Sequence, residues 1–297
     1  DVERSRGLGD VYKRQMEDVP YIDVDSLASA ADVESVQSFG LLFMMFNTKA
    51  APFDDVRVRQ AMHYALDMDK IIETGMLGNA TPATSFLPET YPNYNEASTV
   101  YSYDPEKAEE LLAEAGVDDL SITLLTTDTG WVKEVAPLIK ESLDAIGIDT
   151  TLDIGQSASM YEKVDSGDYT VAIAPGDPSV FGVDPDLLMN WWYGENVWTQ
   201  TRTNWADSAE YAELRTLLDD AVQQQGDEQQ ATWDKAYDLI ADEAVLYPLF
   251  HRKLPTAWSS QELIGFAPVP TTGLSFLDVG VAAVSYTHLR AHETSLH

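Results

Sequence analysis

Apolar runs and amphipathic repeats along the first part of the chain predict strands and helices in turn. The apolar run at 40–49, GLLFMMFNTK, ends in polar residues and predicts a buried strand. Asp54 and Asp55 follow it and are expected in the first turn of a helix, where the helix dipole favours anions. This helix is predicted as one element, with an apolar face made of Val58, Ala61, Met62, Ala65 and Ile72.

The next part of the chain predicts a long loop and then a helix with clear ends. Residues 81–99 contain three prolines and no hydrophobic period, which is typical of a loop. In 104–116, Asp104 is placed as an N-cap and Pro105 as the first helical residue. Gly116 follows the last turn, where glycine commonly ends a helix.

Strict alternation of strand and helix patterns then predicts a layered α/β domain. Strands are predicted at 120–126, 149–154 and 169–174, with helices at 131–147 and 157–167 between them. A β-α-β-α-β order is typical of a sheet covered by helices. The fold class is therefore α/β.

Beyond Pro175 the pattern predicts a loop, two amphipathic helices and a few short strands. The buried positions of these helices are Leu214, Leu217, Leu218 and Ala221 in the first, and Trp233, Ala236, Tyr237 and Ile240 in the second. The short strands are predicted at 245–250, 255–258 and 262–266.

The two ends of the chain are related to each other at the level of DNA. SRGLGDVYKRQ and VSYTHLRAHE can both be written from one DNA segment that is read from opposite strands. This segment resembles the transposase adapter used in sequencing libraries, so we predict that residues 1–15 and 284–297 are translated adapter. We therefore expect the natural protein to extend beyond one or both ends.

Charge excludes several classes of partner. The chain has 18 basic and 50 acidic residues, for a formal net charge of −32. Nucleic acid and anionic membrane surfaces require a basic footprint, so neither is expected as a partner. Such acidity is typical of a solvated surface that the charge keeps soluble, and a habitat of high salt is a second explanation.

The chain also lacks several kinds of chemistry. It has no cysteine, which excludes disulfides and thiolate sites, and no run of 18 apolar residues long enough to span a membrane. Outside the predicted adapter, the histidines are His63 and His251. No G-x-S-x-G, phosphate-binding loop, dinucleotide-binding glycine turn or H-E-x-x-H is present, so neither a cofactor nor a metal is expected.

Candidate ligand-binding residues gather at 175–205, directly after the last predicted strand of the alternating region. Ligands of open α/β sheets bind beyond the carboxyl ends of strands. Aromatic rings with acidic and guanidinium groups between them suit a ligand that carries an amine, although the rings could equally pack a core. The candidates are Asp177, Phe181, Asp184, Trp191, Trp192, Trp198, Arg202 and Trp205.

These candidates have specific expected roles. Asp177 or Asp184 would neutralise an ammonium group, and Arg202 would bind a carboxylate as a fork. The neighbouring Asp184 and Asp186 provide too few ligands at set spacing for a calcium loop.

Three phrases of the sequence resemble one family. They are FNTKAAPFDDVRVRQAMHYALDMDKII, YSYDPEKAEELLAEAG and ADEAVLYPLFHRK followed by LIGF. They resemble the C-terminal half of extracytoplasmic solute-binding proteins of the peptide/nickel ABC-transporter family. The resemblance covers nearly all of residues 37–283.

The resemblance implies a periplasmic-binding-protein-like (type II) lobe from a truncated two-lobed clamp. Residues 37–260 would form the C-terminal ligand-binding lobe, with a hinge strand near 41–48. Residues 16–36 and 261–283 would belong to the N-terminal lobe. A monomeric protein of this kind has no catalytic step, binds a solute between its lobes and delivers it to a membrane permease. It would be extracytoplasmic, in the periplasm or as a cell-surface lipoprotein, with its signal peptide upstream of this chain.

The resemblance also leaves the solute open. The family commonly has Asp-Tyr-x-Asp-Pro after the strand equivalent to 169–174, and the first Asp binds the amino group of a peptide. Alignment on Asp184-Pro185 puts Phe181 at that place, with Asp177 four residues earlier. A peptide is the leading expectation, and an oligosaccharide is the alternative within the family.

Two functions outside solute transport also remain possible interpretations of the sequence. One is an α/β hydrolase that uses His251 with a nearby Ser or Asp. The other is a signalling module that passes its ligand to a receptor.

Overall fold

A mixed β-sheet forms the centre of the molecule. The computed structural model describes residues 15–177, 182–271 and 275–282. The seven-stranded sheet has the order β1-β7-β2-β6-β4-β5, and β3 pairs with β7. Its strands are β1 (Gln15–Glu17), β2 (Asp32–Phe46), β3 (Ala80–Pro82), β4 (Ser121–Thr127), β5 (Asp149–Gly155), β6 (Val171–Gly176) and β7 (Leu246–Trp258).

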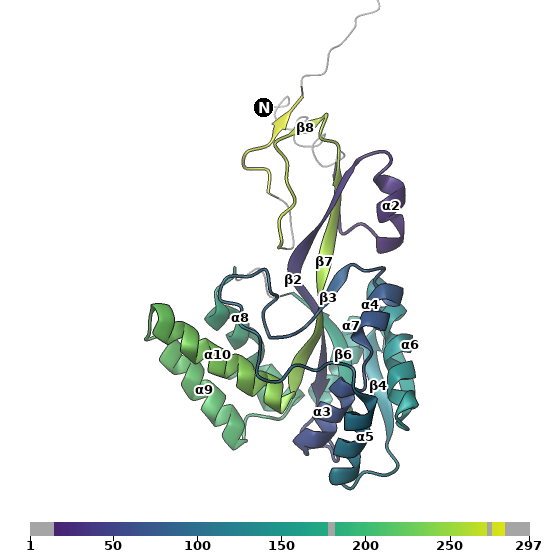
Figure 1. Ribbon diagram of the computed structural model, residues 1–297, viewed down its shortest axis with the longest axis vertical. Coiled ribbons are helices and arrows are strands. Elements are labelled where there is room, and N and C mark those ends of the chain that lie inside the picture. The colour runs from purple at the N-terminus through teal and green to yellow at the C-terminus, as the bar shows by residue number, and fades with distance from the viewer. Residues whose placement is uncertain (1–14, 178–181, 272–274, 283–297) are drawn as a thin grey trace, which may run out of the picture.

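Helices cover this sheet, and α9 and α10 form an antiparallel pair beside it (Figure 1). The helices are η1 (Tyr21–Asp23), α2 (Val24–Leu27), α3 (Val56–Tyr64), α4 (Met68–Gly75), α5 (Pro105–Glu114), α6 (Gly130–Ala145), α7 (Ser157–Ser166), α8 (Pro185–Tyr193), η3 (Trp198–Arg202), α9 (Ala209–Ala221) and α10 (Gly226–Glu243). A separate two-stranded sheet joins β8 (Leu263–Ile264) to β9 (Gly280–Val281).

The predicted α/β alternation is confirmed. The strands β4, β5 and β6 are parallel, and α6 and α7 connect them. The helix α6 buries Val132, Val135 and Ile139 on the sheet, as its amphipathic period predicts. This unit contributes to one hydrophobic core that also includes buried residues of α3, α8 and α10.

Strands β2 and β7 are longer than the apolar pattern predicted. They pair antiparallel from Asp32 opposite Trp258 to Met45 opposite Leu246. In Figure 1 the pair extends out of the helical body toward α2 and β8. The prediction at 40–49 found only the inner, fully buried part of β2, because residues 32–37 are exposed or half-buried and show no apolar run. The strands predicted at 245–250 and 255–258 are likewise one strand, β7.

The single helix predicted after residue 52 is wrong, because the chain forms two helices there. The Asp55 side chain caps α3 by accepting a hydrogen bond from the backbone N–H of Arg57 at 2.9 Å. Asp67 caps α4 by accepting from the N–H of Lys70 at 3.0 Å. Asp54 and Asp55 therefore lie before the first helix and not within its first turn.

The prediction of a loop after Pro175 is also only partly correct. It contains the helix α8 and the π-helical turn η3. The strand predicted at 262–266 is reduced to the two residues of β8. The predicted adapter segments lie outside the described residues, except for Gln15, which pairs with Trp258.

Candidate functional site

The strands β4 and β6 end at the same edge of the sheet. They are parallel, with Leu124 beside Val171 and Thr126 beside Ile173. The loops that follow Thr127 and Gly176 therefore leave from neighbouring points and lead into α6 and α8. Because ligands of open α/β sheets bind beyond the carboxyl ends of strands, this edge is the expected ligand side.

Trp192, one of the predicted binding residues, is packed beneath this edge. Its side chain is 2% exposed, and its ring makes an edge contact with Phe43 at 5.7 Å between centroids. A Cβ at Gly176 would lie 2.6 Å from Trp192 Cζ2, so only glycine lets the end of β6 approach the ring this closely. Trp192 thus supports the strand end from inside.

Trp198 and Arg202 form a compact group with residues of α7. The Arg202 guanidinium lies 4.2 Å from the Trp198 ring centroid and 4.5 Å from that of Tyr161. Arg202 Nε is also 2.7 Å from a carboxylate oxygen of Asp165. Its cation is therefore engaged by two rings and one carboxylate within the chain.

Trp205 lies farther inside the protein. It is 3% exposed and packs against Tyr193 and Tyr211. Together with Trp192 and Trp198, it is part of the main hydrophobic core.

The predicted acidic residue Asp184 has a structural role as the N-cap of α8. One of its carboxylate oxygens accepts hydrogen bonds from the backbone N–H groups of Asp186 at 3.0 Å and Leu187 at 3.1 Å. Asp186 is buried and accepts a hydrogen bond from Trp233 Nε1 at 2.9 Å. Burial raises the pKa of the Asp186 carboxyl above its ordinary value.

Two of the predicted residues lie closer to solvent. Asp177 is half-buried at the end of β6, and Trp191 on α8 is 45% exposed. Burial, with the negative charge of Asp177 as a smaller contribution, raises the pKa of Tyr91 to about 12. Asp177 therefore lies near Tyr91. Phe181 lies outside the described residues.

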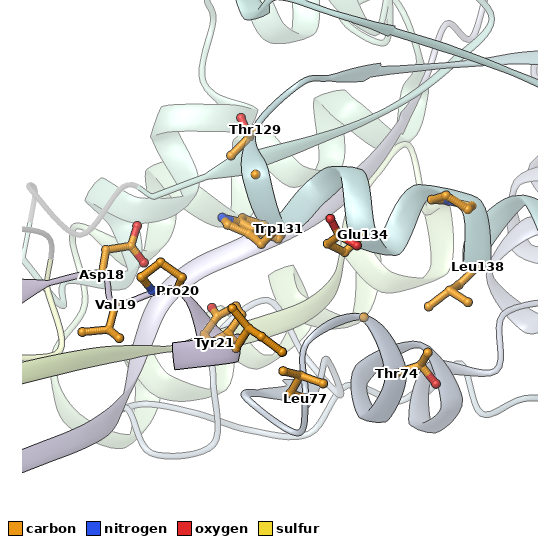
Figure 2. A pocket seen from close by; sticks show the side chains of 14 residues that line it. Asp18, Val19, Pro20, Tyr21, Thr74, Leu77, Thr129, Trp131, Glu134 and Leu138 are labelled. Carbon is orange, nitrogen blue, oxygen red and sulfur yellow. The ribbon is translucent and has the colours of Figure 1, made fainter. Parts of the chain in front are cut away.

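A cavity of about 780 Å³ lies next to the loop that follows β4 (Figure 2). The start of α6 forms one wall, the end of α4 a second, and the segment 18–22 a third. None of the predicted binding residues lines it. Its lining residues are Asp18, Val19, Pro20, Tyr21, Ile22, Thr74, Gly75, Leu77, Thr129, Gly130, Trp131, Glu134, Pro137 and Leu138.

Contacts with β7 fix the shape of this cavity. The Trp131 ring packs on Phe250 with 5.9 Å between centroids, and the Arg252 guanidinium lies 5.4 Å from the same ring. Arg252 Nη1 is 2.8 Å from an Asp18 carboxylate oxygen, and the Tyr21 hydroxyl donates to the Lys253 carbonyl at 3.1 Å. The sequence pattern did not predict this cavity, although Trp131 lies in the first turn of α6, shortly after β4 ends at the ligand edge.

The histidines lie in the core. His251 is 1% exposed, and among the described residues its hydrogen bond is with the backbone carbonyl of Ser85, at 3.4 Å. Burial lowers the pKa of His251 to about 4 and, with the nearby Arg59 charge, that of His63 to about 3. Among the described residues, neither histidine forms a hydrogen bond with a serine hydroxyl.

The described residues contain no cluster of three or more His, Cys, Asp or Glu side chains that could hold a metal ion. Across the same residues, every helix is too short or too polar to cross a membrane.

Comparisons with known proteins agree with this fold. The model of the bacterial extracellular solute-binding proteins, family 5, middle region, matches residues 4–200. A glutathione-binding protein GsiB from Salmonella choleraesuis (strain SC-B67) is 30% identical over 270 residues, covering 88% of this chain and 52% of that protein. Heme-binding protein A of Haemophilus influenzae is 30% identical over 259 residues, covering 83% of this chain and 44% of that protein.

Solved structures show the same similarity. The agropinic acid complex of AgaA from A. tumefaciens R10 has a TM-score of 0.76 and 27% identity, covering 96% of this chain and 60% of that one. A dipeptide-binding protein from Pseudoalteromonas sp. SM9913 in complex with Met-Leu has a TM-score of 0.76 and 21% identity, covering 91% of this chain and 54% of that one.

The chain spans about half the length of the curated relatives it matches. These relatives are named as binding proteins and not as enzymes. The hydrolase reading is therefore set aside, and the resemblance in the sequence motifs is confirmed. The chain belongs to the bacterial extracellular solute-binding proteins of family 5.

Proposed function

We propose that residues 37–260 form the C-terminal ligand-binding lobe of an extracytoplasmic solute-binding protein. Residues 16–36 and 261–283 then belong to the opposite lobe. The observation that carries this proposal is the pair β2 and β7, which leaves the helical body as two adjacent strands. A connection of this kind can bend, so that two lobes close around a ligand.

In this proposal the protein binds a small solute between its lobes and delivers it to an ABC permease. Leu41 of β2 lies opposite Gly176 of β6, so the proposed hinge runs beside the ligand edge of the sheet. The family description as extracellular supports a location outside the cytoplasmic membrane, in the periplasm or on a lipid anchor. We propose that the protein acts as a monomer.

A peptide is the proposed solute. Relatives are named for glutathione and for dipeptide binding, which supports a ligand with an amino group and amide bonds. Asp177 places negative charge at the end of β6, where it would attract such an amino group. The partly exposed rings of Trp131 and Trp191 instead favour an oligosaccharide as the second candidate, because sugar faces stack on aromatic platforms.

Thermal-shift screening of the complete protein against peptides and oligosaccharides tests the proposal. A ligand that binds only the folded state raises the melting temperature. We expect stabilisation by peptides, with a smaller shift in Asp177→Asn. The exposed Asp119→Asn, which removes the same charge from a surface loop, is the matched control.

Stabilisation by oligosaccharides alone would contradict the peptide assignment. If no member of either library stabilised the complete protein, the binding function itself would be contradicted.

A further inference from the structure

We propose that the cavity beside Trp131 and Glu134 binds the part of the solute that carries an apolar body and a positive charge. The inference rests on the proposed function, because it assigns the chemistry of one end of the solute site. The ligand class is an organic cation with an aromatic or branched aliphatic group next to an ammonium or guanidinium.

The walls of the cavity suit an apolar body. Figure 2 shows Trp131, Tyr21 and Leu77 around the open space, with Leu138 on the same helix as Trp131. Leu77 is 48% exposed and Ile22 is 75% exposed, which leaves apolar surface at the cavity uncovered. A volume of about 780 Å³ lies in the range typical of pockets for small organic ligands.

The charged residues that line the cavity favour a positively charged ligand over a negatively charged one. Its lining includes the acids Asp18 and Glu134 and neither lysine nor arginine. Asp18 is neutralised by its ion pair with Arg252. Within the part of the chain that the structure describes, the Glu134 carboxylate has neither an ion pair nor a side-chain hydrogen bond. A cation in the cavity would therefore pair with Glu134, whereas a carboxylate would be repelled.

Trp131 adds to the same preference. Its ring is a flat apolar surface, and the Arg252 guanidinium already lies 5.4 Å from the ring centroid. A ligand cation would therefore stack on the face of the ring opposite Arg252. The formal charge of −32 on the whole chain also raises the local concentration of cations over that of anions.

The cavity joins segments that the proposed function assigns to different lobes. Tyr21 and its neighbours come from the segment before β2, and Glu134 and Thr74 come from the helices of the C-terminal lobe. The Asp18–Arg252 ion pair and the Tyr21–Lys253 hydrogen bond tie the first segment to β7. All walls belong to this chain, so the chain itself can be tested for binding.

Titration calorimetry with three probes of similar size tests the inference on the 297-residue chain. Phenethylamine is the cation, phenethyl alcohol the neutral analogue and phenylacetate the anion. We expect phenethylamine to bind about tenfold more tightly than phenylacetate, with the alcohol between them.

Variants then identify the cavity as the site. Glu134→Gln is expected to reduce the preference for the amine over the anion to about threefold or less. Glu110→Gln removes the same charge from the exposed side of α5 and should leave the preference unchanged. Trp131→Ala should abolish binding of all three probes. Because Trp131 packs on Phe250, the exposed Thr74→Trp serves as a second variant that fills the cavity without removing that contact.

Circular dichroism confirms that each variant is folded. The inference is overturned if no probe binds, if phenylacetate binds as tightly as phenethylamine, or if Thr74→Trp leaves amine binding intact. Failure of the probes while the complete protein still binds peptides would contradict the cavity assignment alone. Amine binding by the chain, without solute binding by the complete protein, would contradict the proposed function and the assignment of the cavity to its solute, and would leave only the preference of the cavity for cations.

Discussion

At the scale of single residues, close packing at the end of β6 leaves no room for a side chain larger than that of glycine at position 176. A Cβ at Gly176 would lie 2.6 Å from Trp192 and 3.2 Å from Phe43. We predict that Gly176→Ala lowers the free energy of unfolding by about 1–3 kcal/mol, because the ring must move out of a filled core. Urea denaturation measures this change. Gly155→Ala is the control, since a Cβ there has nothing within 4 Å, and an equal loss in both variants would contradict the packing argument.

Buried histidines give the chain a defined dependence on pH. The pKa of His63 is lowered to about 3 by burial and by Arg59, whereas an unfolded chain has the ordinary value of 6.5. Below pH 6.5 the unfolded state therefore binds a proton that the folded state does not. The free energy of unfolding should fall by about 1.4 kcal/mol per pH unit for this residue as the pH drops from about 6 toward 3.

His63→Phe tests this pH dependence, because the phenyl ring can keep the stacking on Tyr101. Above pH 7, we expect the free energy of unfolding of the variant to change with pH as it does in the original chain. Below pH 7, we expect it to fall less steeply with decreasing pH than in the original chain. Urea denaturation across this pH range measures both slopes. Identical slopes below pH 6 would mean that His63 is protonated in the folded state.

At the scale of elements, a capping aspartate decides where one helix ends and the next begins. Asp67 accepts a hydrogen bond from the N–H of Lys70 and starts α4. We predict that Asp67→Ala costs about 1 kcal/mol of unfolding free energy. Asp69→Ala, in the first turn of the same helix, should lower the free energy of unfolding by only a few tenths of a kcal/mol, because it removes an interaction with the helix dipole but no cap. Equal losses by urea denaturation would contradict a capping role.

How much of the fold could be predicted depended on such local signals. Asp104-Pro105 predicted the start of α5, and the structure confirms it with a hydrogen bond from Lys107 N–H to Asp104 at 2.9 Å. The same pair at Asp184-Pro185 starts α8, although this stretch was predicted as a loop with binding residues and not as a helix. The outer half of β2 lacked an apolar run because it is only half-buried. Pairing with a distant strand, which local sequence does not encode, makes it a strand.

The candidate site was harder to predict than the fold. A tryptophan in a loop-like stretch can bind a ligand or fill a core, and only its spatial neighbours decide which. Trp192 and Trp205 have aromatic neighbours from β2 and α9 and are buried. Trp131 was predicted only as part of a helix, yet it lines the cavity because its neighbours Tyr21 and Leu77 come from other segments. No contact with a ligand tests the predicted binding roles, so all of them stay predictions: those of Asp177, Phe181, Asp184, Trp191, Trp192, Trp198, Arg202 and Trp205.

At the scale of the whole molecule, the negative charge should make stability depend on salt. A formal charge of −32 destabilises the compact state through self-repulsion. Raising NaCl from about 0.1 M to about 1 M shortens the Debye length from about 10 Å to about 3 Å. We predict a rise of several degrees in melting temperature. An uncharged osmolyte at equal osmolality is the control, and an equal rise with it would contradict the electrostatic explanation.

The proposed two-lobed architecture makes a final prediction about affinity. If the solute lies between two lobes, the complete protein contacts it from both sides, whereas this chain offers mainly one wall. Each 1.4 kcal/mol of lost contact weakens binding tenfold, so we expect the chain to bind the solute found by screening at least about 100-fold more weakly than the complete protein. Calorimetry on both proteins measures the difference. Equal affinities would show that one wall is sufficient, and the bending of β2 and β7 would then have no role in holding the solute.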